Sequence, residues 1–138
     1  MSKQPKIVFM NQNQNAPEWF YRGPSRMRAE ELGWEICVND SGGPLTTEEW
    51  VELIADADAL MTTWGSPKLD ETILAGNESV QIVAHVGGSV AAYATDEIFD
   101  RGIRVSTANP LMARTVAEHC IMLMLMGLRR AHDHIKLG

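Results

Sequence analysis

The glycine pair in the segment His85-Val86-Gly87-Gly88-Ser89 is the part of the sequence best suited to binding a small anion. Glycine has no Cβ, so backbone N–H groups in such a turn can approach a carboxylate closely, and a following helix N-terminus adds positive potential. The same glycines also suit a tight turn between a strand and a helix. Because the segment matches neither G-x-G-x-x-G nor a P-loop, it does not predict a nucleotide phosphate site.

Two further positions could contribute to binding. Trp64 and Gly65 follow an apolar run, where a tryptophan either forms the wall of a pocket or belongs to the core and its rim. His85 ends another apolar run, and a histidine there acts as a ligand or base, or more often as a hydrogen-bonded structural residue. These residues are therefore candidates for binding a small molecule.

The sequence contains no recognisable set of catalytic or metal-binding residues. It has no G-x-S-x-G nucleophile motif, and no Cys-x₂-Cys or His-x₃-His spacing. Arg114 and Glu118 have the spacing of an ordinary ion pair on a helix surface, with His119 beside them. We therefore assign no catalytic residue and no metal ligand to this chain.

Five short apolar runs are expected to form the strands that position these candidates. Their starts lie 21 to 28 residues apart, too far for hairpins but suitable for a strand, a short helix and two loops. The runs occupy residues 6–10, 34–39, 59–63, 80–86 and 103–107. The second, third and fourth runs alternate little between apolar and polar residues, which predicts strands covered by helices on both faces.

The segments between the runs carry helix signals. Thr46 and Glu49 form a capping box, and further helices are expected over residues 25–32, 66–76 and 90–99. This alternation predicts an α/β fold with a five-stranded parallel, doubly wound, flavodoxin-like sheet of order 2-1-3-4-5. Ligands of such sheets bind beyond the carboxyl ends of the strands. The rule nominates Asn11, Trp64 with Gly65, and the turn over residues 86–89.

The last segment predicts a long helix that is apolar on every side. From Val116 to Leu128 nearly every residue is apolar, and the helix begins either at Asn109-Pro110 or at Thr115. One face can cover the sheet, and the other needs a second copy of the protein or a further domain, unless its own domain encloses it. We divide the chain into a domain at residues 1–108 and a linking or dimerisation helix at 109–138, and expect a homodimer.

Composition narrows the class of protein. The chain has 138 residues and a net charge of −6, without the basic cluster that nucleic acids require. Cys37 and Cys120 lie in apolar runs and predict buried free thiols in a reducing compartment. The apolar stretch from Cys120 to Met126 is far shorter than the roughly 20 residues that span a bilayer. We expect a cytoplasmic protein without a membrane partner, and one too short to bind both a cofactor and a substrate.

From Ala57 to Arg130 the sequence resembles the substrate-domain half of the D-isomer-specific 2-hydroxyacid dehydrogenases. The matching features follow one another: a glycine turn after a strand, the strand "RGIRVST", a proline loop, and "RTVAEH" at the start of a long apolar helix. The resemblance implies that the N–H groups of Val86, Gly87 and Gly88 hold the substrate carboxylate and that Trp64 and Gly65 border the same cleft. The loop "TTWGSP" lacks the basic residue of many members, which argues against phosphorylated substrates.

The resemblance also implies an oxidoreductase that acts on CH–OH groups with NAD or NADP. In that family a separate G-x-G-x-x-G domain binds the cofactor and supplies the catalytic arginine, acidic residue and histidine. This chain contains none of them, so Arg114 and His119 are not expected to be catalytic. We expect a truncated chain that binds a small 2-hydroxy or 2-keto acid but is inactive alone. The other hypothesis is a standalone flavodoxin-like binding module that dimerises through its C-terminal helix.

Overall fold

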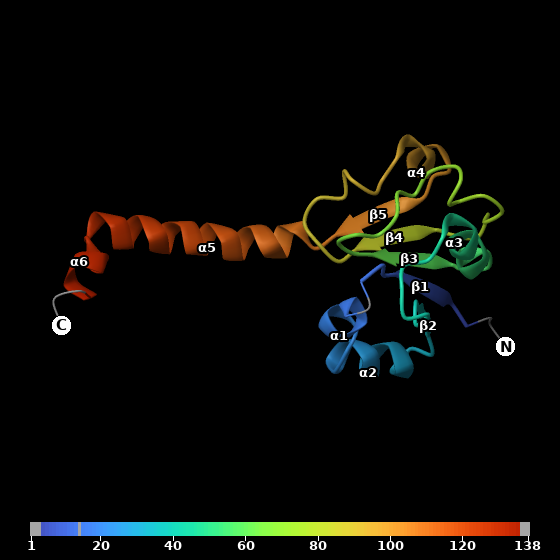
Figure 1. Ribbon diagram of the computed structural model, residues 1–138, viewed down its shortest axis with the longest axis horizontal. Helices are drawn as coiled ribbons and strands as arrows, with labels where there is room; N and C mark the ends of the chain where they lie inside the picture. Colours follow the sequence, from blue (N-terminus) through green and yellow to red (C-terminus); the bar gives the residue numbers. More distant parts are fainter. Residues whose placement is uncertain (1–3, 14, 136–138) are drawn as a thin grey trace.

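The computed structural model describes residues 4–13 and 15–135 and contains one five-stranded parallel sheet (Figure 1). The strand order is β2-β1-β3-β4-β5, which confirms the predicted α/β topology. The strands are β1 (Lys6–Met10), β2 (Glu35–Val38), β3 (Ala59–Thr62), β4 (Ile82–His85) and β5 (Arg104–Thr107). Each lies within one of the five apolar runs.

The helices match the sequence signals unevenly. They are α1 (Ala16–Phe20), α2 (Pro24–Glu31), α3 (Thr47–Ile54), α4 (Asp96–Asp100), α5 (Asn109–Leu128) and α6 (Ala131–Ile135). The capping box of α3 is confirmed: the Glu49 N–H donates to Thr46 Oγ1 at 3.3 Å, and the Thr46 N–H donates to the Glu49 carboxylate at 2.7 Å. Helix α1 was not expected from its polar surroundings. Pro17 lies in the first turn of α1, where the backbone N–H that proline lacks would have no partner within the helix.

Two predicted helices are wrong in whole or in part. Residues 71–76 form consecutive turns, and residues 91–93 form a turn before the short helix α4. The reason is a contact between the two segments, in which Leu69 forms a parallel bridge with Ala94 and its carbonyl accepts from the Thr95 hydroxyl at 2.6 Å. Each segment is held extended by the other, and a helix through that point would break the bridge.

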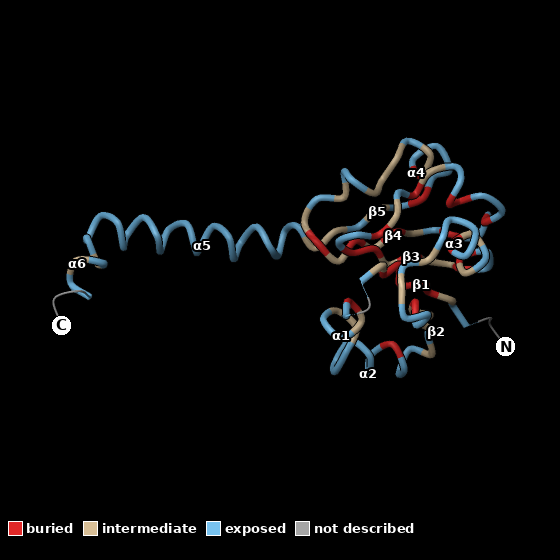
Figure 2. The backbone as a smooth tube through the Cα atoms, in the orientation of Figure 1, coloured by how far each residue is buried: buried red, intermediate tan, exposed pale blue. Residues whose placement is uncertain are grey.

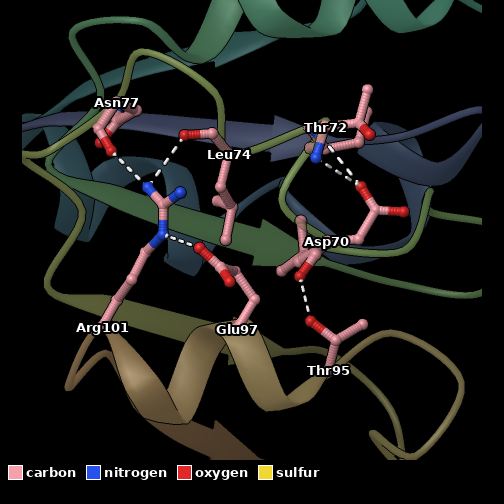
Figure 3. A network of polar contacts seen from close by, with 9 residues as sticks. Asp70, Thr72, Leu74, Asn77, Thr95, Glu97 and Arg101 are labelled. Atoms are coloured by element: carbon pink, nitrogen blue, oxygen red, sulfur yellow. Dashed lines mark hydrogen bonds and ion pairs between the residues drawn. The ribbon is translucent and has the colours of Figure 1, made fainter.

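Arg101, which follows α4, binds the turns at residues 71–77 through its side chain (Figure 3). Its guanidinium donates to the carbonyl oxygens of Leu74 and Asn77, both at 3.0 Å, and pairs with Glu97 on α4. The Leu74 and Asn77 carbonyl groups therefore accept hydrogen bonds from the Arg101 guanidinium instead of from the backbone N–H groups of a helix.

The hydrophobic core lies on one face of the sheet. Val8, Leu60 and Val83 point from the central strands toward Trp50 of α3 and Ile98 of α4, and all five are almost fully buried. Right-handed crossovers place α3, residues 66–77 and α4 on this face, and α1 and α2 on the other. The core is thus built by the helices and turns that follow β2, β3 and β4.

The opposite face of the sheet is only partly covered, so the prediction of strands covered on both faces is wrong for β3 and β4, and it is also wrong for β2, which has no buried residue. Strands β3 and β4 alternate between intermediate and buried residues. A groove of about 470 Å³ lies over this face, lined by the side chains of Ile7, Trp34, Met61, Ile82 and Arg104 among others. The face is bare because α5, which follows β5, extends away from the sheet (Figure 1).

Helix α5 is 20 residues long and has no buried residue (Figure 2). It begins at Asn109, the first of the two predicted starts. By length and composition alone, the whole helix could cross a membrane. The expectation of no membrane span rested only on the shorter apolar run from Cys120 to Met126 and therefore did not predict this. The prediction of two buried thiols is wrong. Cys120 is exposed because α5 does not fold onto the domain, and Cys37 is half-buried because it lies on the edge strand β2.

Candidate functional site

The carboxyl ends of the central strands share one level of the sheet. Thr62 of β3 pairs in register with Met10 of β1 on one side and His85 of β4 on the other, and His85 pairs with Thr107 of β5. The loops after β1, β3, β4 and β5 therefore leave the sheet side by side at the edge where parallel sheets bind ligands.

The glycine turn after β4 presents unused backbone donors at this edge. The Val86 N–H donates to the Thr62 carbonyl at 2.7 Å and so continues the strand pairing. The Gly87 carbonyl accepts from the Ala108 N–H at 3.1 Å, which ties the turn to the start of α5. Within the described part of the chain, the N–H groups of Gly87 and Gly88 donate to no protein acceptor. Of the three N–H groups expected to hold a carboxylate, that of Val86 is used in the pairing of β4 with β3, and those of Gly87 and Gly88 have no acceptor among the described residues.

The packing of the chain requires glycine at position 87 but not at position 88. Neither has a positive φ, so the turn itself does not require glycine. A Cβ on Gly87 would lie 2.4 Å from His85 Nε2, which is too close for two atoms to coexist. A Cβ on Gly88 would meet nothing nearer than the Asn109 side-chain oxygen, at an ordinary 3.5 Å. Packing therefore explains glycine at 87, whereas the space above Gly88 is not used by the chain itself.

His85 is a buried, uncharged support for this turn. Its side chain is only 3% exposed, and its Nδ1 is hydrogen-bonded to Thr62 Oγ1 at 3.0 Å. The ring packs against Tyr93, with 4.9 Å between ring centres. Burial lowers the pKa of the imidazole, so it is neutral at pH 7. The Nδ1 hydrogen bond agrees with the structural role predicted for His85. Nε2 has no hydrogen-bond partner among the described residues, so a role in binding is compatible with the structure as well.

Trp64 and Gly65 lie beside the glycine turn and are joined to it through Tyr93. Gly65 has φ of +82°, a conformation that favours glycine, and its N–H donates to Tyr93 Oη at 3.2 Å. The Trp64 indole is 55% exposed and packs edge-to-face against Phe20 of α1, at 5.5 Å between ring centres. Both predicted segments thus reach one edge. Tyr93, which connects them, carried no signal in the sequence because it acts only through the folded chain.

Asn11, also nominated from the sheet rule, has a structural role. It is fully buried, its amide donates to the Asn39 carbonyl at 3.2 Å, and its side-chain oxygen accepts from the Asn39 N–H at 3.0 Å. The bonds tie the end of β1 to the end of β2. They leave no side-chain group of Asn11 free for a ligand.

The described residues do not fit a dinucleotide or a metal ion. The loop from β1 to α1 contains no glycine, and its first residue, Asn11, is buried in the pairing with Asn39. A pyrophosphate needs a glycine-rich turn at that junction. In the described part of the chain, no three His, Cys, Asp or Glu side chains are grouped to hold a metal. The edge is suited to a small anion that uses two N–H donors.

The family is decided by comparison with known proteins. The model of the D-isomer specific 2-hydroxyacid dehydrogenase catalytic domain matches residues 20–125, which include the glycine turn and Trp64. The chain belongs to this family. None of the curated proteins compared with it matches. The family resemblance expected from the sequence is thereby confirmed, and the standalone module is not favoured.

Solved structures agree on the fold. Residues of 3-phosphoglycerate dehydrogenase from Entamoeba histolytica, a structure with bound NAD+, superpose with a TM-score of 0.64 at 26% identity, over 92% of this chain and 40% of that one. The D-lactate dehydrogenase of Escherichia coli gives 0.57 at 18% identity, over 96% and 40%. The NADPH-dependent glyoxylate/hydroxypyruvate reductase of Sinorhizobium meliloti gives 0.57 at 18% identity, over 99% and 39%. The chain thus spans about two fifths of these enzymes.

The two glycines of the turn should respond differently to alanine. Gly87→Ala forces a Cβ against His85 Nε2 and is expected to lower the free energy of unfolding by about 1–3 kcal/mol. Gly88→Ala places its Cβ in ordinary contact and should change stability by less than about 0.5 kcal/mol. Urea unfolding of the wild type and both variants measures this. Equal losses for the two substitutions would contradict the different roles assigned to the glycines.

Proposed function

We propose that this chain is the substrate-binding domain of a D-2-hydroxyacid dehydrogenase, and that Gly87 and Gly88 hold the carboxylate of a small 2-hydroxy or 2-keto acid. The observation that carries the proposal is the pair of free N–H groups at the carboxyl edge of the sheet, in a chain of this family. Two adjacent N–H donors suit the two oxygens of a carboxylate. Trp64 and Gly65 border the same place, and the exposed indole offers an apolar wall for the rest of the acid.

The acid is proposed to be unphosphorylated. The segment from the end of β3 to Pro67 reads "TTWGSP" and contains no basic side chain beside Trp64 and Gly65; the first one is the exposed Lys68 that follows it. A phosphate carries up to two negative charges at neutral pH and is usually held by arginine or lysine. Backbone donors alone suit the single charge of a carboxylate.

Carboxylate binding can be tested on the isotope-labelled chain by NMR titration with pyruvate. We expect the amide signals of Gly87 and Gly88 to shift most, with Gly65 and the Trp64 indole following, because these groups surround the site. Pyruvamide, which has the same shape without the charge, is the matched control and should shift them at least tenfold less at equal concentration. Pyruvate shifts confined to other parts of the chain would show that the turn is not the site.

In the whole enzyme, hydride would pass between NAD or NADP and the acid, with the cofactor supplying the hydride chemistry. The residues described here do not fit a dinucleotide, and their part is to bind and orient the acid. The chain alone is therefore proposed to be inactive.

Inactivity is tested by mixing the purified 138-residue chain with NADH and either glyoxylate or hydroxypyruvate. The absorbance of NADH is expected to fall no faster than in buffer, since no catalytic side chain is assigned among these residues. Sustained oxidation that scales with protein concentration and survives repeated purification would contradict the assignment.

We also propose that the chain forms a homodimer through α5, over the segment from Val116 to Leu128. Consecutive residues such as Leu123, Met124 and Leu125 are each more than half exposed, so no side of the helix is covered by its own chain. Burying one such side chain contributes about 1.5–3 kcal/mol. The Arg114–Glu118 ion pair, with 3.1 Å between its atoms, would have to enter hydrocarbon if α5 crossed a bilayer, which favours a protein partner. A cytoplasmic location stays a prediction.

Light scattering after size exclusion tests the dimer. The wild type is expected at twice the 15.3 kDa of one chain, and Leu125→Glu should raise the dissociation constant at least tenfold by placing a charge in the interface. Leu111→Glu, the same change on α5 outside the proposed segment, is the control and should leave the dimer intact. A strictly monomeric wild type, or co-flotation with phosphatidylcholine vesicles, would overturn the proposal.

A further inference from the structure

The imidazole Nε2 of His85 is a buried polar atom without a hydrogen-bond partner. Such atoms are costly, because a ring nitrogen removed from water loses its hydrogen bonds unless the protein replaces them. The other ring nitrogen, Nδ1, is satisfied by the Thr62 hydroxyl, and the ring itself is fixed against Tyr93. His85 is thus held in one place with one nitrogen unused.

The unused nitrogen lies close to the backbone of the proposed carboxylate turn. Nε2 is 2.4 Å from the position that a Cβ of Gly87 would occupy. Since that position is one carbon–carbon bond from Gly87 Cα, the ring lies within about 4 Å of the backbone that carries the free N–H groups. A carboxylate bound to the Gly87 N–H would have an oxygen about 2.9 Å from the Gly87 backbone nitrogen. The charge of the ligand and the ring would then be a few ångströms apart.

Among residues 4–13 and 15–135, no charged side chain is hydrogen-bonded to this ring. The groups packed against it are the Thr62 hydroxyl from β3, the Tyr93 phenol from the loop before α4, and the glycine turn itself. No Asp, Glu, Lys or Arg among the described residues is hydrogen-bonded to it or shifts its pKa, which burial alone lowers. Without a ligand, therefore, nothing nearby favours the imidazolium.

We propose that His85 is a positioning residue that takes up a proton from solvent when a carboxylate binds to the Gly87–Gly88 turn. This inference rests on the carboxylate site proposed above. The Thr62 hydroxyl accepts from Nδ1–H in the charged ring, and the negative charge of a carboxylate bound on the turn, a few ångströms from the ring, stabilises the imidazolium. The imidazolium then balances the charge of the acid and fixes it on the turn.

The expected pH dependence follows from this coupling. An anion nearby favours the charged imidazole, so the pKa of His85 is higher in the complex than in the free chain. The acid binds more tightly as the pH falls through the pKa of the complex, and the gain is lost at higher pH. A rise of one pKa unit corresponds to about a tenfold gain in affinity.

The test is an NMR titration of the histidine rings in the 138-residue chain from pH 5 to pH 8, without ligand and with saturating pyruvate. Pyruvate stays ionised over this range. We expect the pKa of His85 to rise by about one unit and pyruvate to bind about tenfold more tightly at pH 5 than at pH 8. His119, exposed on α5, is the internal control, and at each pH its ring signals should be the same with and without pyruvate.

The variant His85→Phe keeps a ring against Tyr93 and removes the titrating group. It should still bind pyruvate, with an affinity that no longer changes between pH 5 and pH 8. If the variant does not fold, the wild-type titration decides alone. An unchanged pKa of His85 at saturating pyruvate would overturn this inference and leave the carboxylate site standing. Absence of any pyruvate shift at Gly87 and Gly88 would overturn both.

Discussion

The hydrogen bond between Thr62 Oγ1 and His85 Nδ1, 3.0 Å long, joins the ends of the two central strands. It fixes the imidazole close to the turn, and the position of the imidazole dictates glycine at 87. Through the ring of Tyr93 the same contact reaches Gly65, so the loop after β3 is held relative to the turn after β4. The arrangement of the candidate site depends on this buried contact together with the backbone bonds from Val86 to Thr62 and from Ala108 to Gly87.

A second constraint is that a parallel sheet must be covered on both faces. Here the helices after β2 and β4 enclose one face, whereas α5 leaves the domain and the other face carries an apolar groove. The chain therefore has two unsatisfied apolar surfaces, the open face and α5. In the related 3-phosphoglycerate and D-lactate dehydrogenases, the residues that match this chain make up about two fifths of the sequence, and the other three fifths have no counterpart in it.

Local sequence patterns predicted much of the fold. The spacing of the apolar runs predicted parallel strands with crossovers, and the order that is common for five-stranded sheets of this kind predicted the strand order. The capping box of Thr46 and Glu49 marked the start of α3, and the strand-end rule nominated the glycine turn for ligand binding. The wrong helices at residues 66–76 and 90–99 and the missed role of Tyr93 have one cause, which is contact between distant segments. Leu69 and Ala94 hold each other out of helices, and Tyr93 acquires its place only when the strands assemble. The exposure of Cys120 likewise depends on where α5 points, which composition does not encode.

The central claim is that the turn after β4 binds a carboxylate through two backbone N–H groups. A crystal structure of the chain grown with pyruvate tests it most directly. The account predicts a carboxylate with oxygens about 2.9 Å from the nitrogens of Gly87 and Gly88, and with His85 unmoved close to them. A carboxylate bound elsewhere, or a turn whose N–H groups are closed onto acceptors of the chain itself, would contradict it.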